Sequence, residues 1–95
     1  MGLKKLVLLS AVEAADQALK LWSENEIIEF IDYSKVRAVG AIGNVQFPSH
    51  VESARLVVVV ASDNLANMIK LVESSGLFLP GKFVMTLESV DVCSV

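Results

Sequence analysis

Apolar residues along the chain alternate between short strand-like runs and longer helix-like stripes. Leu3–Leu9 is a nearly continuous apolar run after two lysines, and Ala54–Ala61 contains four consecutive valines, so both stretches predict buried strands. An amphipathic stretch follows each run, at Ala11–Ser23 and from Ser62 to Gly76. The pattern therefore predicts the same strand–helix unit twice.

Polar residues at the ends of the two stretches predict where the helices start and stop. Ser10, with Glu13 three residues later, fits a capping box, and either Ser62 or Asp63 is expected to cap the second helix. Gly76 is suited to the left-handed residue that ends a helix. The buried stripes are predicted to be Val12, Ala15, Leu19 and Trp22, widened by Ala11, Ala14, Ala18 and Leu21, in the first helix, and Leu65, Met68, Ile69 and Val72 in the second.

Two further strands are expected at Ile27–Val39 and Phe83–Val92. Both faces of the first are half apolar, which indicates one face on the core and the other partly covered by a neighbouring subunit, or a bulge that shifts the register. Between the inner strands, Gly40–Glu52 is predicted to be an irregular loop, because glycines and a proline interrupt any pattern. Its one phenylalanine, Phe47, is expected to fold back onto the protein, and the loop is a natural place for function.

The order β-α-β-β-α-β predicts a single α+β domain over residues 1–95. With right-handed crossovers, this order gives a ferredoxin-like sandwich: a four-stranded antiparallel sheet with two helices on one face. The fold hosts many functions and names none of them.

Composition indicates that part of the surface is covered by something else. The chain is 54% hydrophobic, against about 45–50% for typical soluble domains, and its mean hydropathy is +0.58. A membrane span is not expected, because the longest unbroken apolar run, Leu56–Ala61, is far shorter than the ~20 residues that a spanning helix needs. No cleavage site follows the first apolar run, so a signal peptide is not expected either. Oligomerisation is therefore predicted.

Charge and reactive residues narrow the function classes. A net charge of −3 and a pI near 5.0 argue against nucleic-acid binding. The only cysteine, Cys93, is expected to be a small buried hydrophobe in a cytoplasmic protein. The only histidine, His50, has no partner set for catalysis or for a metal site within one chain, so no enzyme activity is predicted.

Two stretches of the second half resemble the P-II signalling proteins of the P-II/CutA-like superfamily. These are LVVVVASDNLANMIKLVESSG at 56–76 and GLFLPGKFVMTLESV at 76–90. The resemblance implies a homotrimer that binds a small molecule, such as ATP, ADP or AMP, in clefts between subunits. It also implies that the loop after the second strand, residues 40–52, contacts a target protein.

The resemblance carries over to five ligand-binding candidates. Ser75 and Gly76 match the small residues that open the family's nucleotide loop, Gly81 and Lys82 match its Gly-Lys, whose lysine meets phosphate, and Gly40 matches the start of the target-binding loop. The chain departs from the family pattern at other basic positions, where it has Leu77, Val92 and Ser94, so one lysine is left for phosphate. Two alternatives remain: a CutA-like trimer that binds a divalent metal through His50 and carboxylates, and a non-catalytic ligand-binding or assembly module of the same fold.

Overall fold

The computed structural model describes residues 2–93 and contains two α-helices, one short 3₁₀ turn and six strands. In chain order these are β1 (Leu3–Ala11), α1 (Val12–Trp22), β2 (Ile28–Val36), β3 (Gly40–Ile42), β4 (Val45–Phe47), β5 (Ser53–Ala61), η1 (Ser62–Asn64), α2 (Leu65–Ser74) and β6 (Val84–Val90).

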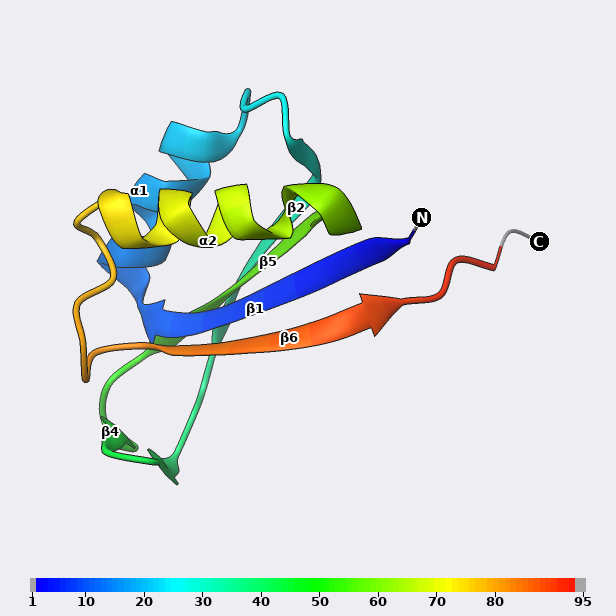
Figure 1. Ribbon diagram of the computed structural model, residues 1–95. Coiled ribbons are helices and arrows are strands. Elements are labelled where there is room, and N and C mark those ends of the chain that lie inside the picture. The colour runs from blue at the N-terminus through cyan, green and yellow to red at the C-terminus, as the bar shows by residue number, and fades with distance from the viewer. Residues whose placement is uncertain (1, 94–95) are drawn as a thin grey trace.

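The four long strands form one antiparallel sheet in the order β2-β5-β1-β6. Both helices lie on the same face of this sheet, as Figure 1 shows. The predicted α+β class, with two helices and a four-stranded antiparallel sheet, is therefore confirmed, and the layout is compatible with a ferredoxin-like arrangement.

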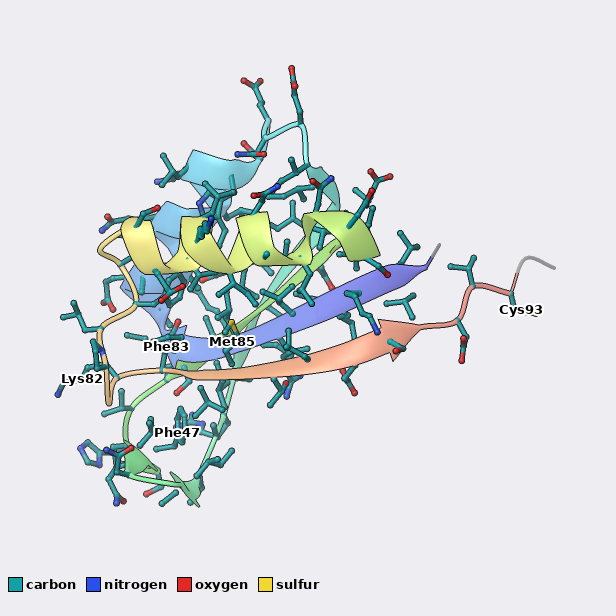
Figure 2. The ribbon with its side chains drawn as sticks, in the orientation of Figure 1. Phe47, Lys82, Phe83, Met85 and Cys93 are labelled. Atoms are coloured by element: carbon teal, nitrogen blue, oxygen red, sulfur yellow. The ribbon has the colours of Figure 1, made fainter. Side chains whose placement is uncertain are left out.

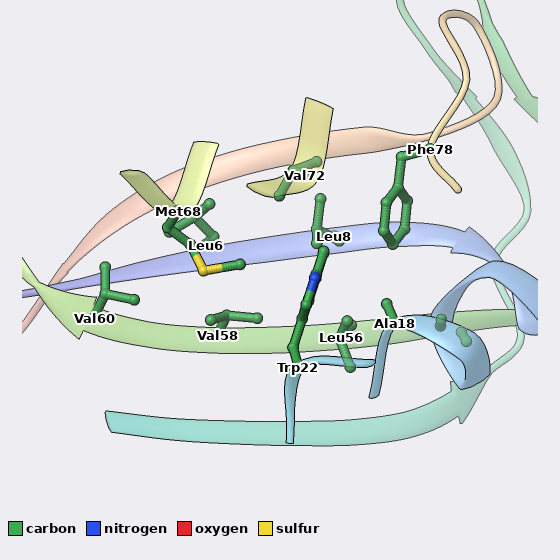
Figure 3. Close-up of a cluster of buried hydrophobic side chains, with 12 residues drawn as sticks. Leu6, Leu8, Ala18, Trp22, Leu56, Val58, Val60, Met68, Val72 and Phe78 are labelled. Carbon is green, nitrogen blue, oxygen red and sulfur yellow. The ribbon is translucent and has the colours of Figure 1, made fainter. Parts of the chain in front are cut away.

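The core fills the space between the helices and this helix-covered face. Successive residues of a strand point to opposite faces, and the even-numbered residues of β1 and β5 point toward the helices. Their side chains join those of both helices and of Phe78 in one cluster (Figure 3): Leu6, Leu8, Ala15, Ala18, Trp22, Ala54, Leu56, Val58, Val60, Met68, Val72 and Phe78.

Trp22 is a core residue, as its position on the apolar stripe predicts, and it is 1% exposed. Its ring stacks on that of Phe78 with centroids 5.8 Å apart. Its indole Nε1–H is buried without a hydrogen-bond partner among the described residues. An unsatisfied buried donor costs about 1–3 kcal/mol, so the ring is retained for its packing rather than for its polar group.

The predicted caps of both helices are wrong, and sheet pairing explains the first. β1 continues to Ala11, two residues beyond the predicted end, and Ser10 pairs with Ala54 and is buried. Its hydroxyl donates to the Ala11 carbonyl at 3.1 Å, so α1 starts after Ala11 with no side-chain cap. The backbone pairing with β5 extends over both residues and prevails over a single capping bond.

At the second helix, a 3₁₀ turn precedes α2 and displaces the predicted cap. The Ser62 hydroxyl donates to the Gly2 carbonyl at 2.9 Å, and Asn64 stands at the helix start without a side-chain cap. The predicted stop is confirmed: Gly76 has φ +73° directly after the C-cap residue Ser75.

The predicted bulge in the second strand is confirmed between Ile28 and Phe30. Beyond it, Ile31 and Tyr33 pack on the core, while Phe30 and Asp32 point to the opposite face. Because of this register shift, the imperfect alternation of apolar and polar residues in the sequence still gives β2 one side that faces the core and one side that faces away from it.

No helix covers that opposite face, which we call the open face (Figure 1). It carries Phe30, Asp32 and Ser34 of β2, Arg55, Val57 and Val59 of β5, Leu3, Lys5, Val7 and Leu9 of β1, and Val84, Thr86, Glu88 and Val90 of β6. Most of its apolar side chains are partly exposed, and Phe30 is 56% exposed.

Three predictions about single residues are wrong. Ala11 was expected in the buried stripe of the first helix, but it ends β1 and is exposed. Cys93 is exposed, because β6 ends at Val90 and the chain leaves the sheet before the cysteine. Leu21 was expected to widen the buried stripe of α1, but it lies on the outer side of the helix and is 63% exposed. Among residues 2–93, no helix is long and apolar enough to cross a bilayer.

Candidate functional site

The segment between β2 and β5 contains a β-hairpin, so the prediction of an irregular loop at Gly40–Glu52 is wrong in its middle part. β3 and β4 pair antiparallel, with Ile42 opposite Val45 across the two-residue turn Gly43-Asn44. Gly43 has φ +60° and Asn44 has no positive φ, a pattern that matches a type II′ hairpin turn.

One edge of the hairpin is fixed to the body of the protein. Val45 and Phe47 of β4 are each 7% exposed, which confirms that Phe47 folds back onto the protein. Arg37 Nη1 donates to the Ser49 carbonyl at 3.1 Å and ties the two ends of the segment together. By contrast, all three residues of β3 are exposed. The hairpin therefore has an anchored strand and a free strand.

A second turn lies at the same end of the sheet as the hairpin. The Lys82 backbone N–H donates to the Leu79 carbonyl at 3.0 Å, and Gly81 has φ +78°, which favours glycine. Figure 2 shows Lys82 just before β6, at the end of the molecule where Phe47 lies, whereas Cys93 lies beyond the other end of β6. The turn thus places the Lys82 backbone next to the hairpin.

The hairpin and this turn enclose a hollow of about 290 Å³, which we call the hairpin hollow. Its lining includes Ser10, Phe47, Glu52, Ser53, Gly81 and Lys82. The structure therefore brings the predicted Gly81 and Lys82 together with the predicted functional loop. Glu52 belongs to the predicted functional loop, whereas Ser10 and Ser53 were missed as lining residues, because their proximity depends on the pairing of β1 with β5.

Ser75 and Gly76 lie elsewhere and form the end of α2. The Ser75 hydroxyl donates to the Val72 carbonyl at 2.8 Å and accepts the Leu77 N–H at 3.2 Å. Ser75 lines a different, shallow groove with Leu21 and Leu77. These contacts give Ser75 and Gly76 a turn-forming role, and their ligand-binding role stays a prediction.

Gly40 begins β3 with φ +122° and is exposed. It does not line the hairpin hollow. Its positive φ instead suits the point where the chain turns from β2 into the hairpin. A direct ligand contact by Gly40 stays a prediction as well.

The charges of the hairpin hollow have no partners in the part of the chain that the structure describes. The ion pairs found there are Lys5 with Glu88 and Lys20 with Asp16, and neither pair touches the hollow. Glu52 and Lys82 both line the hollow, and both are exposed. Glu52 directly precedes β5, and Lys82 lies two residues before β6. The lining of the hollow therefore includes one acidic and one basic residue, neither of which forms an ion pair within residues 2–93.

A metal site does not form within the described part of a single chain. Over residues 2–93, no group of three or more His, Cys, Asp and Glu side chains is close enough to hold an ion. His50 is exposed after the hairpin. A metal site that used this histidine would need ligands from another copy.

Neither a scan against protein-family models nor a search of curated proteins finds a match to this chain. Function must therefore be argued from the geometry and from the resemblance described above.

Proposed function

We propose that the chain is a small trimeric signalling protein of the P-II-like class, with a ferredoxin-like fold, that acts in the cytoplasm and has no catalytic activity. It senses a small molecule, with an adenine nucleotide as the ligand that the resemblance implies, and it contacts a target protein through residues 40–52. The observation that carries the proposal is the hairpin hollow, where this segment and the Gly81-Lys82 turn line one cavity.

The ligand-sensing part of the proposal rests on how the hollow is built. A ligand that contacts Lys82 also reaches β4 and Glu52, so binding changes the surroundings of the hairpin. The free strand β3 then presents its exposed side chains, including Ile42 at 54% exposure, to the target. A ligand can alter target binding in this way only if it favours one hairpin arrangement over another.

The trimeric part of the proposal rests on the open face. Burial of apolar surface stabilises by about 25 cal/mol per Å², and the open face carries apolar side chains on all four strands. Covering this face with two further copies accounts for the apolar excess of the composition, at 54% hydrophobic residues.

The test combines light scattering with a thermal-shift screen. The ligand panel holds ATP, ADP, AMP, cyclic AMP, 2-oxoglutarate, bicarbonate and divalent metal ions. A ligand at a hundred times its dissociation constant adds about 2.7 kcal/mol of stability, which gives a clear shift for a small domain. We expect a trimer and a nucleotide response that Lys82→Ala abolishes, while the control Lys70→Ala, an exposed lysine of α2, keeps it.

Three results would contradict the proposal. A monomer at micromolar concentration removes the assembly, and an equal ligand response in Lys82→Ala and in the unmodified protein removes the role of Lys82. Stabilisation by a divalent metal alone, lost in His50→Ala, would support the CutA-like alternative instead.

A further inference from the structure

We propose that β6 pairs with β6 of a second copy of this chain, antiparallel and about a two-fold axis, so that two four-stranded sheets join into one. This inference goes beyond the proposed function, which uses the open face and the hairpin hollow. The pairing uses backbone groups at the edge of the sheet, whereas the proposed trimer uses side chains of the open face. Either assembly can therefore exist without the other, and where both exist the pairing joins two trimers.

The backbone of β6 is unpaired on its outer side. The strand stands at the end of the order β2-β5-β1-β6 and pairs only with β1. Among residues 2–93, no backbone hydrogen bond from a turn or loop reaches Val84–Val90, and β6 borders the sheet in Figure 1. The free N–H and C=O groups of an edge strand are a template for a further strand.

The other edge strand, β2, carries protection that β6 lacks. β2 has a bulge near its start and three exposed charged residues, Glu29, Asp32 and Lys35. Bulges and charges are the features by which proteins keep sheet edges apart. By contrast, β6 pairs with β1 without a bulge, and its only charge, Glu88, already forms an ion pair with Lys5. Of the two edges, β6 is therefore the one suited to pairing.

An exposed leucine lies in the middle of this edge. Leu87 is paired with the fully buried Leu6, so its side chain is on the helix-covered side of the sheet, yet it is 50% exposed. Met85 lies on the same side and packs against the core. The cover that the helices give to this side therefore ends before Leu87. Pairing of two β6 strands would place a second Leu87 beside the first and remove apolar surface of both from water.

The side chains of β6 are complementary to themselves in one register. With the two-fold axis at Leu87, all seven residues of the strand have a partner. Each Leu87 then lies opposite its counterpart, each Val84 opposite Val90, and each Thr86 opposite Glu88. Apolar pairs directly opposite each other stabilise a sheet, whereas like charges destabilise it. An axis at Glu88 would set two carboxylates opposite each other, so the charge selects the register at Leu87. This self-complementarity indicates a second copy, rather than a foreign peptide, as the partner.

Disulfide cross-linking tests the register. Directly opposite residues of an antiparallel pair have Cα atoms about 4.5–5.5 Å apart, which is within the range of about 4.4–6.8 Å that a disulfide spans. In a Cys93→Ser background under mild oxidation, Leu87→Cys should form cross-linked dimers at least tenfold faster than the control Leu21→Cys, which changes an exposed leucine of α1. A mixture of Thr86→Cys and Glu88→Cys chains should also cross-link, whereas each alone should not. Non-reducing gel electrophoresis measures the rates.

Light scattering over a range of concentrations tests the association itself. A single strand edge is a small contact, and contacts below about 1,200 Å² are typical of weak association. We therefore expect the mass of the unmodified protein to double between micromolar and millimolar concentration. Leu87→Lys sets two ammonium groups opposite each other and should abolish this doubling, whereas the control Leu21→Lys should keep it. Circular dichroism spectra of every variant reveal a folding defect.

The outcomes separate this inference from the proposed trimer. Doubling from three chains to six that Leu87→Lys abolishes supports both assemblies, and doubling from one chain to two supports the pairing and contradicts the trimer. Three chains at every concentration overturn the pairing and leave the trimer standing. Doubling that persists in Leu87→Lys also overturns the pairing, as does a Leu87→Cys chain that cross-links no faster than Leu21→Cys.

Discussion

Both faces of the sheet carry apolar side chains, but the two faces have very different surroundings. On the helix-covered face, Leu6, Leu8 and Leu56 are fully buried by α1 and α2. On the open face, Val7 and Leu9 remain partly exposed although they alternate with those same residues along β1. The difference teaches that apolar alternation in a strand shows which residues share a face, whereas the order of elements decides which face the chain itself can cover.

A charge placed in the middle of the open face gives the largest expected effect. Val57 lies on β5 between Val7 and Asp32, so Val57→Glu would bury an unpaired carboxylate in the proposed trimer interface. An uncompensated buried charge costs about 3–5 kcal/mol, and we expect the trimer to dissociate. Analytical ultracentrifugation measures this change directly.

The control for this variant is Leu21→Glu, which adds the same charge on the outer side of α1. It should leave the sedimentation coefficient unchanged. If Val57→Glu also sediments like the unmodified protein, the open face is not the interface and the comparison between the two faces loses its functional meaning.

Two adjacent leucines of β1 give the next largest effect. Leu8 is fully buried under the helices, and Leu8→Ala should lower the free energy of unfolding by about 2–5 kcal/mol at every protein concentration. Leu9 lies on the open face, so Leu9→Ala should cost less in dilute protein, where the proposed trimer would dissociate, and more as the concentration rises. Urea unfolding at several concentrations measures both.

The concentration dependence is the decisive observation for this pair. An equal cost of Leu9→Ala at all concentrations would mean that the open face is as exposed in the native protein as it is in a single chain. A concentration-dependent cost of Leu8→Ala, with none for Leu9→Ala, would place the interface on the helical side.

The long elements of the fold could be predicted because each has a strong local pattern. The four valines of β5 and the stripe through Met68 and Val72 in α2 are consistent over many residues, and these elements form where they were expected. The caps at Ser10 and Ser62 could not be predicted, because each serine makes a contact that depends on tertiary structure. Ser10 lies in a strand that pairs with β5, and Ser62 contacts the distant Gly2.

The hairpin was missed although its turn carries a sequence signal. Gly43-Asn44 between apolar residues is a hairpin pattern, but strands of only three residues on each side are too short to stand out from a loop. Of the candidate site residues, Gly81 and Lys82 followed from the resemblance. Their neighbours Glu52 and Ser53 line the hollow because β5 begins there. A residue pattern along the chain does not show that the start of β5 lies close to the Gly81-Lys82 turn.

Gly76 gives a smaller effect, which is confined to the helical layer. A Cβ at this position would meet no atom within 4 Å, so the cost of Gly76→Ala is the left-handed backbone alone, about 1–2 kcal/mol. Gly76→Asn should cost less, since asparagine tolerates this conformation. Thermal unfolding measures both variants. Loss of the trimer in Gly76→Ala would indicate that the helix end, and not only the open face, takes part in assembly.

The smallest effect concerns the ion pair on the open face, and it tests the environment of that face most finely. Lys5 Nζ lies 3.3 Å from Glu88 Oε2, with the side chains 36% and 55% exposed. A solvent-exposed pair contributes about 0.2–1 kcal/mol and is weakened by salt.

A double-mutant cycle with Lys5→Ala and Glu88→Ala should give a coupling energy in this range for dissociated chains. In the assembled protein the coupling should be larger and less sensitive to salt, because neighbouring copies exclude water from the pair. A coupling that stays small and salt-sensitive at concentrations where the protein is assembled would show that the edge of the open face along β6 remains in water, and would restrict the interface to β5 and β2.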